Sequence, residues 1–431
     1  MVLDANFTQS IVSITEFVCS ITAYFVATIN VIKVLNKKWL CLALLCACFS
    51  SISTAQVIPL PFDNYFSKRK GLQHTVQAIT QHKHATVAFL GGSITYNGGW
   101  RDMVCAYLKE RFPDTKFHFI AAGIPSLGSL PHAFRVSRDV LDSGRIDLLF
   151  LEAAVNDQVN GTDSITQVRS LEGIVRHVKK ANPQTDILLM SFADPDKTKL
   201  YDEGLVPTAV ANHELVATYY GLPSINLAKA VHDKMRNQEF SWEKDFKDLH
   251  PSPFGQQIYF SAIKILLDSS LTPAVSKYKA GKLPKMLNRA SFINGKYYGP
   301  EHAVYDQNWT LDRSWSPEDK LPTRPGFVQV PMLVSSKAGA SLSLKFSGNT
   351  VGINIVSGAD AGILEYRIDN GHEQQINLFT PWSTSLHIPW YLILGSDLGL
   401  GEHTLSLKIS DQKDPKSNGN TCRIVNFLIN N

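Results

Sequence analysis

A serine lies in a sharp glycine-rich turn at Gly91-Gly92-Ser93-Ile94-Thr95, directly after a short apolar run. Glycines leave the backbone of such a turn uncovered, so the neighbouring hydroxyl can be exposed as a nucleophile. The same residue types also form ordinary strand-to-helix turns. By itself, therefore, the turn only makes Ser93 a candidate.

A carboxylate and an imidazole lie close together much later in the chain, in Asp248-Leu249-His250-Pro251. An acid next to a histidine can fix its tautomer and stabilise the imidazolium, while the other ring nitrogen takes a proton from a hydroxyl. Histidine and acid pairs are also common on protein surfaces. Asp248 and His250 become candidates for catalysis because Ser93 is present as well.

Two more segments offer hydrogen-bond donors for a developing oxyanion. Asn156 follows an apolar run in Glu152-Ala153-Ala154-Val155-Asn156-Asp157, and its amide can donate. The loop 121–129 carries glycines, where a backbone N–H can approach a substrate oxygen closely. An Asn-Asp pair after a strand can equally be a turn or a helix cap.

The elements that would position these residues are short β-rich runs alternating with amphipathic helices from residue 66 to 275. This pattern predicts a parallel sheet covered by helices on both faces. Because the strands' carboxyl ends share one edge of such a sheet, Ser93, loop 121–129 and Asn156 are expected to converge there. The predicted strands are 86–90, 116–121, 146–153 and 186–192.

The pattern changes after residue 275, and residues 285–431 are predicted to form a second, all-β domain. Apolar and polar residues alternate there with period two over 342–346, 351–355, 364–368 and 405–409. Asp369-Asn370-Gly371 predicts a hairpin turn. Short antiparallel strands at this spacing are typical of a β-sandwich.

Taken together, the four chemical segments resemble, in this order, the four signature blocks of the SGNH (GDSL-like) hydrolase superfamily. The family's Gly-Asp-Ser-Leu block reads Gly-Gly-Ser-Ile here, so Gly92 replaces the acid. Its Gly-x-Asn-Asp block begins with Ala154. Its last block has Asp and His separated by only one residue, Leu249. These departures are typical of an outlying branch.

The resemblance implies a three-layer α/β/α, flavodoxin-like hydrolase domain followed by a jelly-roll-like β-sandwich. It also implies two-step acyl transfer in which Ser93 attacks an ester carbonyl, His250 takes the proton and Asp248 orients the histidine. The N–H groups of Ser93 and Gly128 and the amide of Asn156 would hold the oxyanion, with Gly123 as the alternative to Gly128. Neither a metal nor a cofactor is expected.

By analogy with secreted esterases that carry a sandwich domain, the expected substrate is an O-acetylated polysaccharide or oligosaccharide. A lipid esterase or thioesterase and a catalytically silent glycan-binding surface protein are the alternatives. Candidate substrate contacts are Tyr96, Asn97, Trp100, Arg101 and His213. Four further aromatic residues, Trp309, Trp315, Trp382 and Trp390, are candidates either for stacking on sugar rings or for core packing.

Composition narrows the classes further. The 431 residues are 44% hydrophobic and 19% charged, with 42 Lys and Arg against 38 Asp and Glu. Basic residues do not cluster among aromatics, which argues against nucleic acid as a partner. Cys105 and Cys422 are the two cysteines outside the leader, too few for a disulfide framework or a cysteine metal site.

The N-terminus predicts export. Residues 36–55 have a lysine pair, an apolar core and a small-residue cleavage site, as in a bacterial secretory signal. Residues 1–35 are interpreted as an extension from a start assigned too early, although their apolar stretch is a membrane-span alternative. Leu45-Cys46-Ala47-Cys48 also resembles a lipoprotein box, with Cys48 lipidated. The mature chain is expected to be secreted or periplasmic, or a surface lipoprotein.

Overall fold

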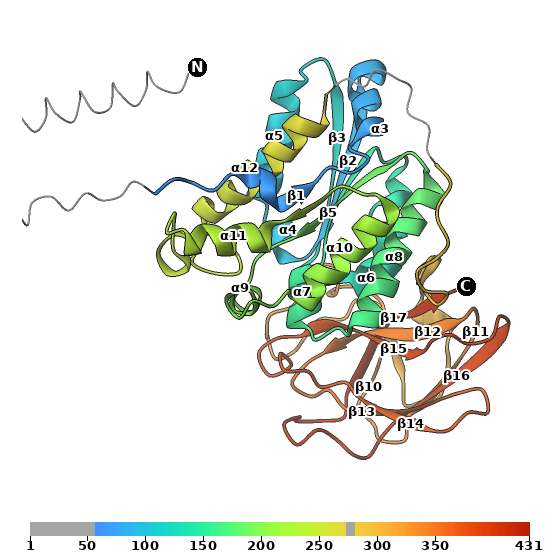
Figure 1. Ribbon diagram of the computed structural model, residues 1–431. Helices are drawn as coiled ribbons and strands as arrows, with labels where there is room; N and C mark the ends of the chain where they lie inside the picture. The colour runs from blue at the N-terminus through green and yellow to red at the C-terminus, as the bar shows by residue number, and fades with distance from the viewer. Residues whose placement is uncertain (1–56, 273–280) are drawn as a thin grey trace, which may run out of the picture. The chain divides into compact units, whose positions relative to one another are not determined.

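A six-stranded sheet organises the first half of the chain (Figure 1), and the computed structural model describes residues 57–272 and 281–431. The spatial order is β1-β6-β5-β4-β2-β3, and the five strands from β6 to β3 are parallel. The predicted signal segment and N-terminal extension lie outside the described residues. The strands are β1 (Phe66–Ser67), β2 (His84–Gly91), β3 (Lys116–Gly123), β4 (Leu148–Glu152), β5 (Asp186–Ser191) and β6 (Ser224–Asn226).

This strand order confirms the predicted flavodoxin-like sheet. Among the parallel strands, the second in the chain lies beside the first, and the third, fourth and fifth follow on the first strand's other side. After β3 the chain crosses back over β2, so β4 lies on the opposite side of β2 from β3. The strand order therefore reverses between the neighbouring strands β2 and β4. In such sheets, ligands bind outside the carboxyl ends of the strands at this switch point.

Helices cover both faces of the sheet. Successive residues of β2 point to opposite sides, and the residues on each side are buried. Val87 and Phe89 belong to one buried core, and Ala88 and Leu90 belong to the other. The first core is covered by α3 (Gln73–Gln77), α5 (Trp100–Arg111), α11 (Leu227–Arg236) and α12 (Pro253–Ser270). The second is covered by α6 (Ser129–Asp139), α8 (Ser164–Ala181) and α10 (Thr208–Tyr220).

The second half of the chain is a sandwich of two antiparallel sheets, as predicted. One has the order β15-β12-β17-β10-β9, with β7 also paired to β17, and the other has the order β14-β13-β16-β11-β8. The first sheet comprises β7 (Gly295–Tyr298), β9 (Thr310–Asp312), β10 (Met332–Ser335), β12 (Thr350–Ser357), β15 (Ile388–Gly395) and β17 (Cys422–Asn430). The second comprises β8 (Val304–Tyr305), β11 (Ser341–Ser347), β13 (Ile363–Ile368), β14 (Gln374–Asn377) and β16 (Glu402–Ile409).

The predicted hairpin turn joins β13 to β14. Asp369 has φ +52°, and the Gly371 N–H donates to the Ile368 carbonyl at 2.9 Å. Asp tolerates this left-handed conformation better than most residues. The turn brings β14 back beside β13 at the edge of its sheet.

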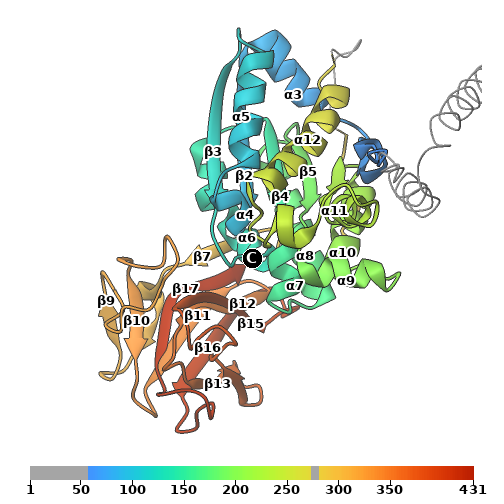
Figure 2. The same cartoon turned by 90° about the vertical axis from the view of Figure 1, so that its left-hand side faces the viewer.

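The two halves share one hydrophobic core, and Pro59–Asn431 forms one compact unit. Phe134 of α6 lies 5.2 Å, between ring centroids, from Phe292, which precedes the sandwich. Phe327 and Met332 extend this core into the second half. The sandwich lies at the end of the parallel sheet where α4 (Ser93–Tyr96), α6 and α7 (Ala154–Val159) begin (Figures 1 and 2). The domain limits 66–275 and 285–431 stay predictions, since the shared core gives no clean division.

Over the parts of the chain that the structure describes, no helix has the length and apolar character needed to span a bilayer. Cys105 and Cys422 are both free thiols; the first is half-buried and the second is buried in β17.

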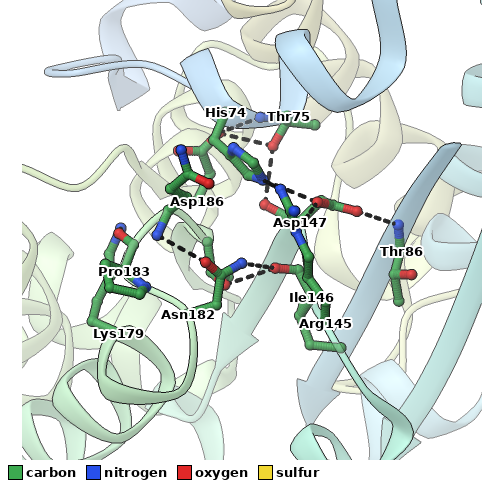
Figure 3. Close-up of polar contacts among 12 residues, drawn as sticks. His74, Thr75, Thr86, Arg145, Ile146, Asp147, Lys179, Asn182, Pro183 and Asp186 are labelled. Atoms are coloured by element: carbon green, nitrogen blue, oxygen red, sulfur yellow. Dashed lines mark hydrogen bonds and ion pairs between the residues drawn. The ribbon is translucent and has the colours of Figure 1, made fainter. Parts of the chain in front are cut away.

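Two carboxylates at the amino-terminal end of the sheet hold α3 in place (Figure 3). Asp147 contacts His74 Nε2 at 3.0 Å and accepts from the Thr86 N–H at 2.8 Å. Asp186 accepts from both the N–H and the hydroxyl of Thr75, each at 2.8 Å. Burial raises the pKa of Asp186 to about 6. Above that pH the Asp186 carboxylate is charged, and the two hydrogen bonds from Thr75 stabilise this charged form.

The first prediction concerns this contact. Because Asp186 has a raised pKa in the folded state, its contribution to stability is present at low pH and declines as pH rises through about 6. Replacing Thr75→Val removes one donor and is expected to lower the free energy of unfolding by about 1–3 kcal/mol. The loss should be larger at pH 8 than at pH 5, measured by urea denaturation. Thr80→Val is the matched control, since the Thr80 hydroxyl donates to the Val76 carbonyl and should show no such pH dependence.

Candidate active site

Ser93 is the first residue of the short helix α4, directly after β2. The Tyr96 and Asn97 N–H groups bond to the carbonyls of Gly92 and Ser93 at 3.0 and 2.9 Å and close the turn. The Ser93 side chain is half-buried, at the carboxyl edge of the sheet. The turn thus leaves its hydroxyl accessible.

His250 is positioned by the segment that leads into α12. Ser252 caps this helix, with Pro253 as its first residue, and the Ser252 N–H donates to the Phe246 carbonyl at 2.9 Å. Phe246 is fully buried in the core beneath. The segment is therefore anchored on both sides of an exposed imidazole.

The structure brings Ser93 and His250 together, with 2.8 Å between Oγ and Nε2. This geometry allows the ring to take the hydroxyl proton as the oxygen attacks. Asp248 is not brought to the ring: within residues 57–272 and 281–431 it has no hydrogen bond to His250. Its carboxylate accepts instead from the Leu249 N–H. The expectation that Asp248 orients the imidazole is therefore not met in this structure, because the short Asp-Leu-His spacing directs the carboxylate into its own turn.

Asn156 lies in α7, immediately beyond β4, with its side chain beside Gly92. A Cβ atom on Gly92 would fall well inside contact distance of the Asn156 amide oxygen. In this chain, glycine at position 92 therefore leaves room for the Asn156 amide. Across the described ranges, the Asn156 amide forms no hydrogen bond, so it is available to a ligand.

Gly128 lies on the other side of Asn156, at the start of α6. A Cβ atom on it would fall well inside contact distance of Asp157 Oδ1 and 3.3 Å from the backbone carbonyl carbon of Asn156. Gly123 is instead the last residue of β3 and is packed against the Tyr96 backbone. Gly128 thus lies beside Asn156 and Asp157, and its role as the oxyanion donor, with Gly123 as the alternative, stays a prediction.

Asp157 holds the Gly128 segment in place. Its Oδ1 accepts from the Ser129 N–H at 2.8 Å and from the Ser129 hydroxyl at 2.9 Å. Burial raises the pKa of this carboxyl to about 7. In the sequence, Asp157 stood out only as part of the Asn-Asp motif. In the structure it follows Asn156 and bonds to the residue after Gly128, so it connects the two segments that carry the predicted oxyanion donors.

Arg135 is a second residue that the sequence did not single out. It is fully buried, and its Nη2 donates to the carbonyls of Gly91 and Ala122 at 3.2 and 2.7 Å. These carbonyls end β2 and β3, so one guanidinium fixes both strand ends beneath the site. Its ion pair with Asp139 at 2.8 Å compensates its charge.

The predicted substrate contacts divide into two groups. Tyr96 and Asn97 are exposed, and Arg101 donates to the Thr95 carbonyl at 2.9 Å. Trp100 is 0% exposed and packs against Phe89 and Phe192, so its expected substrate contact is corrected to core packing. His213 is likewise buried and bonds to the Ala209 carbonyl.

The four sandwich tryptophans also divide. Trp309 and Trp315 are buried, the latter against His387 and Arg423, so both serve packing. Trp382 is 38% exposed. Trp390 lines a pocket of about 280 Å³ that also includes Gly128. The Trp390 side chain itself packs against the core of the sandwich, so of this set only Trp382 is exposed enough to offer a ring face to a ligand.

No group of three or more His, Cys, Asp or Glu side chains suited to a metal ion occurs in the described part of the chain. The site consists of a hydroxyl, an imidazole and free N–H donors. This set suits attack on a carbonyl and stabilisation of the resulting oxyanion.

The second prediction tests the central pair. Ser93→Ala and His250→Ala should each lower the rate of carbonyl attack, measured with a chromogenic acetate ester, by roughly 10⁴-fold or more. Asp248→Asn should lower it less than about tenfold, because an exposed carboxylate without a hydrogen bond to the imidazole acts on the ring only through water. A loss in Asp248→Asn equal to that in His250→Ala would show that the carboxylate does orient the ring during turnover.

The third prediction concerns Gly92. Gly92→Ala should displace the Asn156 amide and lower turnover by about 100-fold, as expected for the loss of one oxyanion donor. Asn156→Ala should have a similar effect, and the double variant should be no worse than either. Gly399→Ala is the control, since a Cβ atom there meets no other group within 4 Å. A fully active Gly92→Ala enzyme would contradict the role of the amide.

Comparison with known proteins agrees with this geometry. Residues 89–258 match the family model described as the GDSL-like Lipase/Acylhydrolase family. No curated protein sequence matches the chain significantly. The structure is similar to that of a two-domain esterase (CEX) active on acetylated mannans, co-crystallized with mannopentaose, at 19% identity and a TM-score of 0.70, covering 86% of this chain and 98% of that one. A second structure of a two-domain esterase (CEX) active on acetylated mannans matches at 20% identity and a TM-score of 0.69, covering 85% and 98%.

The structural similarity extends over both halves, so the α/β sheet and the sandwich recur together in another protein. At this identity it establishes the fold. The family match covers the segment from β2 to α12 that contains Ser93, Asn156 and His250. Residues 89–258 of this chain are therefore similar to the GDSL-like lipase/acylhydrolase family, and the resemblance to SGNH hydrolases is confirmed.

Proposed function

We propose that this protein is a serine esterase that removes O-acetyl groups from a polysaccharide or oligosaccharide. The observation that carries the proposal is the 2.8 Å contact between Ser93 Oγ and His250 Nε2, at the sheet edge where Asn156 and Gly128 offer free donors. The GDSL-like family match supports ester hydrolysis as the reaction class.

In the proposed mechanism, His250 removes the Ser93 proton as Oγ attacks the ester carbonyl. The N–H groups of Ser93 and Gly128 and the Asn156 amide bind the oxyanion. His250 then gives its proton to the departing sugar oxygen, which leaves as a hydroxyl, and an acetyl-enzyme remains. Water, deprotonated by the same ring, attacks this ester; as the bond to Ser93 Oγ breaks, His250 returns the proton to Oγ and acetate is released.

The surroundings of Gly128 favour a carbohydrate over a long acyl chain. The adjoining pocket is lined by residues 389–393 of β15 and by the polar residues Asn160, Thr162 and Asp163. Convergent hydrogen-bonding groups of this kind suit the hydroxyl groups of a sugar. The CEX proteins of similar fold are described as active on acetylated mannans, which supports the same substrate class here.

Export of the protein is part of the proposal, because a polysaccharide substrate is extracellular. Residues 36–55 have the composition of a secretory signal, which supports export. The alternative is that the exported protein is anchored by a lipid on Cys48.

The fourth prediction is the substrate test. The purified protein should release acetate from acetylated polysaccharides and hydrolyse a 4-nitrophenyl acetate ester at least about tenfold faster than the octanoate, because in the proposed function the site binds an acetyl group and does not accommodate a longer chain. Acetate release is followed enzymatically across acetylated mannan, xylan and bacterial polysaccharides.

Ser93→Ala is the control in every assay. Faster hydrolysis of the octanoate ester would favour a lipid esterase or thioesterase. Binding of the polysaccharide without hydrolysis of any ester would favour a glycan-binding protein.

A further inference from the structure

One residue from outside the α/β half reaches the oxyanion loop. Arg324 lies between β9 and β10 of the sandwich, and its Nε donates to the Ser126 hydroxyl at 2.9 Å. Ser126 lies two residues before Gly128, in the loop that connects β3 to α6. The contact therefore joins the second half of the chain to the backbone that presents a proposed oxyanion donor.

Ser126 needs external support because its backbone is strained. Its φ is +71°, the left-handed region that residues other than glycine rarely adopt. Such conformations persist where surrounding contacts fix them, and they concentrate at functional sites. Two contacts fix this one: the bond from Arg324, and a bond from Asn160 Nδ2 to the Ser126 carbonyl at 2.9 Å.

The segment that carries Arg324 is itself firmly held. The His387 N–H donates to the Pro322 carbonyl at 2.8 Å, and the Gln329 N–H donates to the Trp315 carbonyl at 2.8 Å. Between these points, Phe327 is buried in the core that both halves share. Arg324 is therefore presented from a rigid support.

The charge of Arg324 is not explained by an ion pair. Its guanidinium is half-buried, and among the described residues no carboxylate lies within salt-bridge distance of it. Burying a charge without a partner is unfavourable. Its one close contact with the α/β half is the Ser126 hydroxyl, which argues that holding this loop is its role.

We propose that Arg324 is a positioning residue of the esterase, which fixes Ser126 and thereby the Gly128 N–H, so that turnover depends on the β-sandwich half. This inference rests on the proposed function for its kinetic consequence. Its structural part, the bracing of the loop by Arg324, does not depend on that function.

The fifth prediction follows. Arg324→Met should lower kcat for 4-nitrophenyl acetate by about 10- to 100-fold, with KM changed less than about twofold, because a displaced donor weakens binding of the transition state more than of the substrate. Ser126→Ala should give a similar loss. The double variant should lose no more than either single variant, since both remove the same contact. If the losses of kcat in the two single variants multiply in the double variant, the proposal is overturned.

Arg313→Met is the matched control, because Arg313 is an exposed arginine of the same half. It should leave both constants unchanged. The melting temperature of Arg324→Met should stay close to that of the wild type, which separates positioning from loss of the fold.

Hydrogen exchange tests the bracing without turnover. In Arg324→Met, the backbone N–H groups of Ile124, Ser126, Leu127 and Gly128 should exchange faster than in the wild type, while those of β4 stay unchanged. Unchanged exchange in the loop would overturn the proposal even in an active enzyme. A wild type that hydrolyses no ester would refute the proposed function, and the loop exchange would still decide whether Arg324 braces Ser126.

Discussion

The hydrogen bond between His250 and Ser93 joins positions 157 residues apart, and the other parts of the site are arranged around it. Ser93 is fixed by β2, and His250 by the segment before α12. A contact of this length tolerates little displacement, so both supports must be rigid. The parallel sheet provides that rigidity for the serine, and the buried Phe246 provides it for the histidine.

Buried polar groups provide the next level of positioning. Arg135 bonds to the carbonyls that end β2 and β3, and Asp157 bonds to Ser129 beside Gly128. Each places an ionisable side chain in a buried setting, which lowers stability unless its bonds are well formed. Their bonds converge on the strand ends that carry the site. Burying these ionisable groups lowers the stability of the fold, and their bonds fix the positions of a few backbone groups at the site.

The sequence was informative where a signal is local. Alternation predicted β11 and β13, turn residues predicted the hairpin from β13 to β14, and the glycines around Ser93 predicted the turn after β2. The prediction did not include β17, because it is buried on both faces and shows no alternation. Trp100 was misplaced because an aromatic near the nucleophile reads the same whether it faces substrate or core.

Side-chain contacts were the hardest to foresee. The spacing of Asp248 and His250 indicated that they could meet, but backbone geometry sends the carboxylate to Leu249. Arg324 gave no signal at all, because it belongs to no motif and its partner Ser126 lies far away in the sequence. Contacts of this kind follow from the tertiary fold alone.

The core that runs without interruption from α6 and α8 into the sandwich has an evolutionary meaning. Many glycan-active enzymes are assembled from modules on flexible tethers, which recombination can add, delete or shuffle. Here Phe292, Phe327 and Met332 are packed into that common interior, and severing them would expose apolar surface on both fragments. A substitution on one side of this seam is therefore constrained by the residues packed against it from the other side.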